Sequence, residues 1–182
     1  MVFNEQTANR IAIFDPKTET LTEYMVPSKN PGWADCEQIK DCGLAQIFDF
    51  TIDGSKIWFT EWVENNIGVV DTSIGLPFEV ELDTDQITLG KGDTATIILK
   101  VLPLTSSDIP NVTITYSSTA QFSDIVINTD IDQFQLDFDG PRVIQTSITA
   151  NENALNNIYK VLIGAQTDEV AISKYVTVKI VQ

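Results

Sequence analysis

The sequence predicts an all-β protein that consists of two parts. Apolar and polar residues alternate over short segments, as they do in strands that bury one face. Clusters of Gly, Pro, Asn, Asp and Ser separate these segments, and helical spacing is nearly absent. The composition also changes along the chain: the three tryptophans and both cysteines all precede residue 76, and Val, Ile and Thr dominate after Pro77.

The first part contains an internal repeat. Residues 54–62 (GSKIWFTEW) and 66–71 (NIGVVD) predict a turn, a strand, a second turn and a second strand. A similar pattern lies 56 residues earlier, and a fixed period of this kind is typical of repeat architectures. The matched pairs are Asn9 with Asn65, Ile11 with Ile67, Ile13 with Val69, Asp15 with Asp71, and Glu23 with Glu79. Because such repeats usually span about 40–50 residues, we assign the excess to an inserted loop at 30–43.

Four stretches resemble the repeats of the streptogramin (virginiamycin B) lyase-like β-propeller family: NRIAIFDP (9–16), LTEYMVP (21–27), IWFTE (57–61) and NIG (66–68). The resemblance covers about residues 9–72. It implies one to two blades of a propeller, too few to close a ring. The positions that match the blade motif are Trp58, Glu61, Asn66, Gly68 and Asp71.

The resemblance implies the fold of that family and not its activity. Activity in the family is associated with histidines that act beside a bound Mg²⁺, and this chain contains no histidine. Glu61 and Glu64 are acidic residues near the motif, but Glu61 belongs to the repeated pattern, which favours a structural role. We therefore expect a non-catalytic chain with no bound cofactor. The alternative is a fragment of a Mg²⁺-dependent lyase-like enzyme whose catalytic blades lie elsewhere.

The second part predicts an immunoglobulin-like β-sandwich. About seven short strands fit into about 105 residues. We expect these strands at 86–89, 94–102, 111–118, 122–127, 143–149, 159–165 and 170–181. The stretches ITLGKGDTATI (87–97) and YKVLIGA (159–165) resemble hairpins of bacterial and archaeal cell-surface Ig-like modules.

The boundary between the two parts is expected after residue 76, which gives domains at 1–76 and 77–182. Residues 72–77 form a turn-rich run that follows the last blade motif. Residues 78–82 either open the second domain, which we favour, or form the outer strand of the second blade.

Cys36 and Cys42 lie in the inserted loop and are predicted to form a local disulfide. Their spacing is not that of a CxxC redox motif, and two cysteines alone do not make a structural zinc site. A bridge over so short a loop stabilises by about 2–3 kcal/mol and would place the protein outside the reducing cytosol. The alternative is a pair of buried free thiols.

Two further features are candidates for modification or metal binding. Asn111-Val112-Thr113 is an N-glycosylation sequon, with Asn111 as the acceptor. Side chains two apart on a strand share a face, so paired carboxylates of this kind are weak candidates for binding Ca²⁺. The residues concerned are Asp130, Asp132, Asp137 and Asp139. The alternative for them is a solvated face that protects an edge strand.

The net charge and the lack of a visible targeting segment limit where the protein can be located and which partners it can bind. With 11 basic and 26 acidic residues, the net charge of −15 disfavours nucleic acid and anionic lipid. No apolar run is long enough to span a bilayer, and residues 1–5 do not form a signal peptide. We expect the C-terminal part of a longer extracellular or cell-surface protein, with an upstream export signal. Its expected partners are a protein or glycan ligand, or upstream blades of the parent chain.

Overall fold

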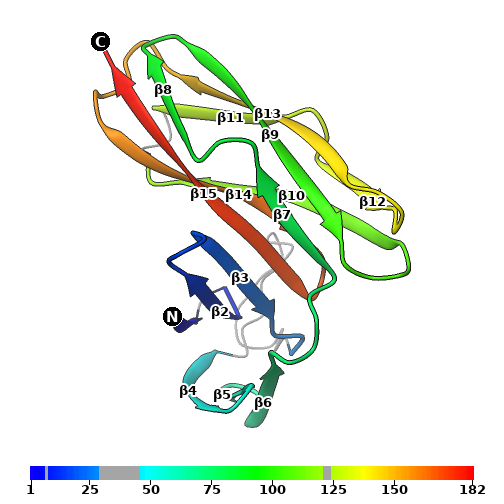
Figure 1. The fold of residues 1–182 in the computed structure, drawn as a ribbon. Coiled ribbons are helices and arrows are strands. Elements are labelled where there is room, and N and C mark those ends of the chain that lie inside the picture. The colour runs from blue at the N-terminus through cyan, green and yellow to red at the C-terminus, as the bar shows by residue number, and fades with distance from the viewer. Residues whose placement is uncertain (7, 29–45, 121–123) are drawn as a thin grey trace, which may run out of the picture. The chain divides into compact units, whose positions relative to one another are not determined.

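The structure, a computed structural model, describes residues 1–6, 8–28, 46–120 and 124–182. The described residues form fifteen β-strands (Figure 1), and the predicted all-β class is confirmed. Contacts divide the chain into two units. The N-terminal unit comprises Met1–Pro16, Leu21–Gly75 and Asp168–Ala171. The C-terminal unit comprises Lys17–Thr20, Leu76–Thr167 and Ile172–Gln182.

The N-terminal unit contains two hairpins with the same strand register. The first joins β1 (Val2–Glu5) to β2 (Arg10–Asp15), and the second joins β5 (Lys56–Glu61) to β6 (Asn66–Asp71). The first hairpin pairs Val2 with Ile13, Phe3 with Ala12, Asn4 with Ile11, and Glu5 with Arg10. The second pairs Trp58 with Val69, Phe59 with Gly68, Thr60 with Ile67, and Glu61 with Asn66. Each residue of these four pairs in the second hairpin lies 56 residues after its counterpart in the first.

The two hairpins also enter their second strands in the same way. Asn9 precedes β2 with φ 58° and Asn65 precedes β6 with φ 53°. Asparagine is among the few residues that tolerate this left-handed conformation, because its short polar side chain hydrogen-bonds locally. The Asn9 side chain also donates to two carbonyl oxygens much further along the chain, those of Val26 and Ser28, at 3.0 and 2.9 Å.

Each hairpin belongs to a larger sheet. Strand β3 (Thr20–Met25) follows β2, and β4 (Ile47–Asp53) pairs with β5 to give the sheet β4-β5-β6. Gly54, with φ 59°, makes the tight turn between β4 and β5. A buried cluster joins the hairpin β1–β2 to one face of the sheet β4-β5-β6. Its members are Ile11, Val26, Ile47, Ile57, Phe59 and Val70.

The C-terminal unit contains two sheets whose strands contact each other. One sheet has the order β11-β13-β9-β7, from Ile125–Thr129, Arg142–Ala150, Thr94–Pro103 and Phe78–Leu82. The other runs β12-β10-β14-β15, from Gln133–Leu136, Ile109–Ser118, Ile158–Gln166 and Val170–Val181. Strand β8 (Gln86–Gly90) runs parallel to β15 and the remaining described pairs in this unit are antiparallel. Its core includes Phe78, Ile97, Leu99, Val101, Leu136, Ile144, Ile148 and Ile163.

Several details differ from the expectations. Strands β1, β4 and β12 were not predicted. Strand β11 begins at Ile125, and residues 122 and 123 of the expected strand lie outside the described residues. The ambiguous segment Phe78–Leu82 pairs with β9 of the C-terminal unit.

Candidate functional site

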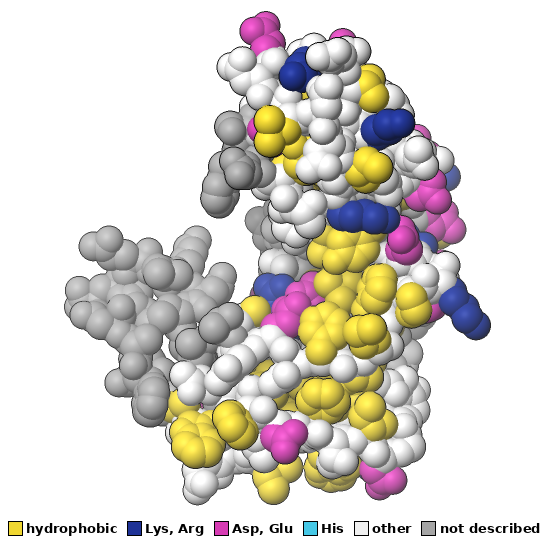
Figure 2. Space-filling view, turned by 90° about the vertical axis from the view of Figure 1, so that its left-hand side faces the viewer, with side chains coloured by type: hydrophobic (Ala, Val, Ile, Leu, Met, Phe, Trp, Pro, Cys, Tyr) yellow, Lys and Arg dark blue, Asp and Glu magenta, His cyan; other side chains and the backbone are white. Residues whose placement is uncertain are grey.

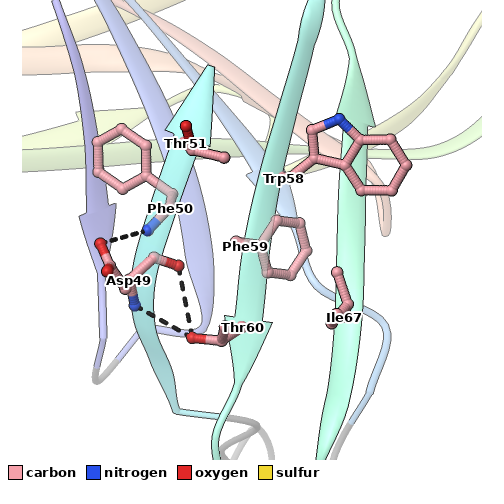
Figure 3. Close-up of a pocket in the computed structure, with 7 residues that line it drawn as sticks. All are labelled: Asp49, Phe50, Thr51, Trp58, Phe59, Thr60 and Ile67. Carbon is pink, nitrogen blue, oxygen red and sulfur yellow. Dashed lines mark hydrogen bonds between the residues drawn. The ribbon is translucent and has the colours of Figure 1, made fainter. Parts of the chain in front are cut away.

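The candidate site is a shallow apolar groove on the sheet β4-β5-β6. It has a volume of about 240 Å³ and draws its lining from all three strands (Figure 3). The lining residues are Asp49, Phe50, Thr51, Trp58, Phe59, Thr60 and Ile67. Side chains alternate along each strand, so this sheet has an inner face packed on β1–β2 and an outer face. We define the outer face by Trp58, Thr60, Ile67 and Val69.

The hydrogen bonds within the groove centre on Asp49 and Thr60. The Asp49 carboxylate accepts a hydrogen bond from the Phe50 amide at 2.8 Å. The Asp49 amide donates to Thr60 Oγ1 at 3.3 Å, and that hydroxyl donates to the Asp49 carbonyl at 3.5 Å (Figure 3). Among the lining residues only Asp49 is ionisable. The groove is therefore suited to apolar contact more than to proton transfer.

Exposed hydrophobic side chains are common around the groove. Figure 2 shows a dense group of hydrophobic side chains in the lower half of that view. In residues 46–75 the large exposed hydrophobics are Phe48, Ile52, Trp58, Trp62, Ile67, Val69 and Ile74. The Phe48 and Trp62 rings lie 5.5 Å apart between centroids, tilted by 46°. Such a concentration in one short segment is typical of a contact surface.

The blade-motif residues have distinct structural roles. Gly68 lies opposite Phe59, and a Cβ atom there would lie 2.2 Å from the Phe59 ring. Asp71 accepts hydrogen bonds from the Ser73 hydroxyl and amide at 2.6 and 3.0 Å, and from the Ser55 hydroxyl at 3.2 Å. The bonds from Ser73 hold the pKa of Asp71 below its usual value. These hydrogen bonds to Asp71 stabilise the turn after β6.

Glu61 is buried at the end of β5 and pairs with Asn66, which is exposed. Its Oε2 atom has no hydrogen-bond partner among the described residues. Its counterpart one repeat earlier is Glu5, which lies beside Arg10 and Glu23. Arg10 Nη1 donates to Glu23 Oε1 at 2.6 Å. Burial, with a hydrogen bond and repulsion from Glu23, raises the pKa of Glu5 to about 7.

The cluster of Glu5, Arg10 and Glu23 was not anticipated from the sequence. Its three members come from β1, β2 and β3. Extending the 56-residue comparison back to Val2 would have matched Glu5 with Glu61 and pointed to a buried carboxyl at this position.

The predicted calcium ligands act as hydrogen-bond acceptors in turns. Asp130 Oδ1 accepts from the Gln145 amide at 2.9 Å, and Asp132 Oδ1 accepts from the Thr129 hydroxyl at 2.7 Å. Asp137 Oδ1 accepts from Gln135 at 3.2 Å, and Asp139 is exposed. Within the described ranges, no group of three or more acidic, His or Cys side chains is arranged to hold a metal ion.

Asn111 lies in an irregular part of β10. The register of β10 against β12 shifts between Ile109 and Val112, and Asn111 has φ 56°. The residue is exposed, as a glycan acceptor must be.

Cys36, Cys42 and the inserted loop at 30–43 lie outside the described residues. The part of the chain that the structure describes has no helix able to cross a membrane.

Comparison with protein-family models finds no match, and comparison with curated protein sequences finds none either. Solved structures give slight similarities. Domains 4 and 5 of the S-layer protein SbsC match 70% of this chain at 12% identity, with a TM-score of 0.43. A family 123 glycoside hydrolase from Clostridium perfringens matches 59% at 12% identity and a TM-score of 0.48. Salmonella alpha-2-macroglobulin matches 69% at 13% identity and a TM-score of 0.46.

The matched regions cover 65%, 27% and 8% of those three chains, respectively. This chain therefore spans less than two thirds of each similar structure. At these scores the similarities carry no argument about what the chain binds or does.

Proposed function

We propose that this chain is a non-catalytic part of an exported, surface-associated β-propeller protein. In this proposal β1 to β6 belong to two blade repeats, and residues 77–182 form an Ig-like module that acts as a spacer. The chain either binds a partner or serves as a structural scaffold in the parent protein. Its partners are further blades of the parent protein, or a protein or glycan ligand.

The observation that carries the proposal is the shared register of the two hairpins. Four residue pairs of β1–β2 recur 56 residues later in β5–β6. Both hairpins also begin their second strand after an asparagine with positive φ. A repeated supersecondary unit that buries one face on its neighbour is the basis of propellers and other repeat proteins.

The strand order of the C-terminal unit supports the Ig-like part of the proposal. Four strands form one sheet in the order β11-β13-β9-β7, and β10, β14 and β15 are adjacent in the other. The Tyr159 hydroxyl, at the start of β14, shares its proton between the Asp124 carboxylate at 2.8 Å and the Leu155 carbonyl, four residues upstream, at 3.3 Å. A tyrosine that bonds back to the backbone in this way resembles the tyrosine corner of Ig-like domains.

The apolar groove supports binding over chemistry. Asp49 and Thr60 hydrogen-bond each other, and the other lining groups are aromatic, aliphatic or hydroxyl-bearing. The enzyme alternative rests on one observation, the buried Glu61 Oε2 without a partner among the described residues. A buried carboxylate oxygen in that state is one that a metal ion can satisfy.

Two assays test the proposal. The first incubates the full parent protein with a streptogramin B lactone and Mg²⁺, with Glu61→Gln as the matched variant. We expect no ring opening and no effect of Mg²⁺ on the melting temperature of either protein. Mg²⁺-dependent ring opening that Glu61→Gln abolishes would establish the enzyme alternative.

The second assay labels intact cells that produce the parent protein with an antibody against residues 77–182. The proposal predicts labelling without permeabilisation. Labelling only after permeabilisation would contradict a surface location.

A further inference from the structure

One face of the hairpin β1–β2 is covered by the sheet β4-β5-β6. Ile11 is fully buried in the shared cluster, and Val2 and Ile13 pack against that cluster. The contact also includes a polar anchor: Asn4 Nδ2 donates to the Ile47 carbonyl at 2.8 Å. The covering face of the sheet is formed by Ile47, Ile57, Phe59 and Val70.

Adding 56 to each residue of the covered face gives the outer face of β4-β5-β6. Val2, Asn4, Ile11 and Ile13 correspond to Trp58, Thr60, Ile67 and Val69. The equivalent positions are apolar again, apart from Thr60, which replaces Asn4 as a polar group. Their exposure is greater: Ile67 is 74% exposed, Val69 46% and Trp58 39%, whereas Ile11 is fully buried and Val2 and Ile13 are partly buried.

We propose that the outer face is the docking surface for a further repeat of the same kind. The occupant is a three-stranded antiparallel sheet that presents the equivalents of Ile47, Ile57, Phe59 and Val70. This inference rests on the proposed blade repeats and names the partner of the groove. Burial of the apolar face is the driving force, as for any such patch.

The chemistry of the face matches this occupant better than a second copy of the chain. In another copy the covering face is already buried, with Ile57 only 2% exposed, so that copy would have to open its own core. Charges lie at one end of the outer surface, where Lys56 is in register with Asp53 and with Asp71. The centre of the face remains uncharged, as the centre of the covered face is.

The test uses an extended chain in which residues 16–71, one full period, are repeated directly after Asp71. The variant Ile67→Asp at the original position is compared in the 182-residue chain and in the extended chain. Ile158→Asp is the matched control, because Ile158 is an isoleucine of the C-terminal unit with 61% exposure. The measurement is the midpoint of chemical unfolding, together with the mass in solution.

We expect Ile67→Asp to leave the midpoint of the 182-residue chain unchanged, as the control does. In the extended chain Ile67→Asp should lower the midpoint, and the control should not. A neutral Ile67→Asp in both chains would overturn the proposal. So would an inserted repeat that stays unfolded, seen as random-coil amide signals.

The mass measurement identifies the competing occupant. A 182-residue chain that forms a discrete oligomer, and that Ile67→Asp converts to a monomer, would show a second copy on this face and overturn the proposal. Cross-strand NOEs in the same chain separate this inference from the function on which it rests. If the two hairpins lack the shared register, the blade proposal itself fails; if they keep it and Ile67→Asp is neutral, only the docking proposal fails.

Discussion

Ile11 and Ile67 occupy the same position in two hairpins 56 residues apart, yet Ile11 is fully buried and Ile67 is 74% exposed. The local sequence is therefore not what separates them. The difference arises because the sheet β4-β5-β6 covers Ile11, whereas Ile67 lies on the outer face of that sheet. In repeat architectures each unit buries one face on its neighbour, and the docking proposal therefore places a further repeat over Ile67.

Truncation of these two isoleucines should have very different effects on stability. We expect Ile11→Ala to lower the free energy of unfolding of the N-terminal unit by about 2–5 kcal/mol, because it leaves a cavity in the core. Ile67→Ala should change it by no more than about 0.5 kcal/mol, as for most surface positions. Urea unfolding followed by tryptophan fluorescence measures both. Equal losses would show that the outer face is covered.

Gly68 should not accept a side chain. The added Cβ would lie 2.2 Å from the Phe59 ring, which is buried and cannot move freely. We expect Gly68→Ala to destabilise by about 1–3 kcal/mol, as overpacking does. The double variant Gly68→Ala/Phe59→Leu should recover part of the loss relative to Phe59→Leu alone. A neutral Gly68→Ala, measured by thermal unfolding, would contradict the packing of Phe59 over β6.

Stability of the N-terminal unit should fall as the pH rises towards 8. Burial and Glu23 raise the pKa of Glu5 from 4.5 to about 7, so between these values the folded state binds a proton that the unfolded state releases. The stabilisation is fully present below pH 4.5 and is lost as the pH rises through about 7. Two neighbouring charged groups act on the pKa of Glu5: Glu23 raises it and Arg10 lowers it.

The variant Glu5→Gln tests this dependence, with the exposed Glu79→Gln as the control. Unfolding free energies measured from about pH 5 to pH 8 should decline in the native protein and in the control. The slope should be much smaller in Glu5→Gln. An unchanged slope would remove Glu5 as its source.

Tyr159 should be important to the C-terminal unit. Its hydroxyl donates to the buried Asp124 carboxylate at 2.8 Å, and burial together with Asp124 raises the pKa of Tyr159. Tyr159→Phe leaves that carboxylate without this donor, so we expect a loss of about 1–3 kcal/mol. The double variant Tyr159→Phe/Asp124→Leu should be less destabilised than the sum of its two single variants. Strict additivity in calorimetry would argue against the bond.

Much of the strand pattern could be predicted because it is local. The repeat at Asn9–Asp15 and Asn65–Asp71 is visible from residue types alone, and so are long alternating strands such as β9. Strand β4 was missed because its register shifts between Ile47 and Phe50, which interrupts the alternation. Strand β12 has only four residues, too few for a periodic signal.

The candidate site could be predicted only in part. The motif identified Trp58 and Gly68. The alternation of apolar and polar residues predicts the same burial for Ile11 and Ile67, because it shows which face of a strand is apolar but not whether another element covers that face. The cluster of Glu5, Arg10 and Glu23 depends on three strands brought together by the fold. The predicted disulfide between Cys36 and Cys42 lies outside the described residues and stays a prediction.

The most direct test of the account is the solvent accessibility of methyl groups, measured by NMR with a soluble paramagnetic probe. One spectrum reports on both copies of the repeat. The account predicts that the methyl signals of Ile67 and Val69 are strongly broadened and that those of Ile11 are protected. Equal protection of Ile11 and Ile67 would contradict the claim that one face of the repeat is covered and its equivalent is not.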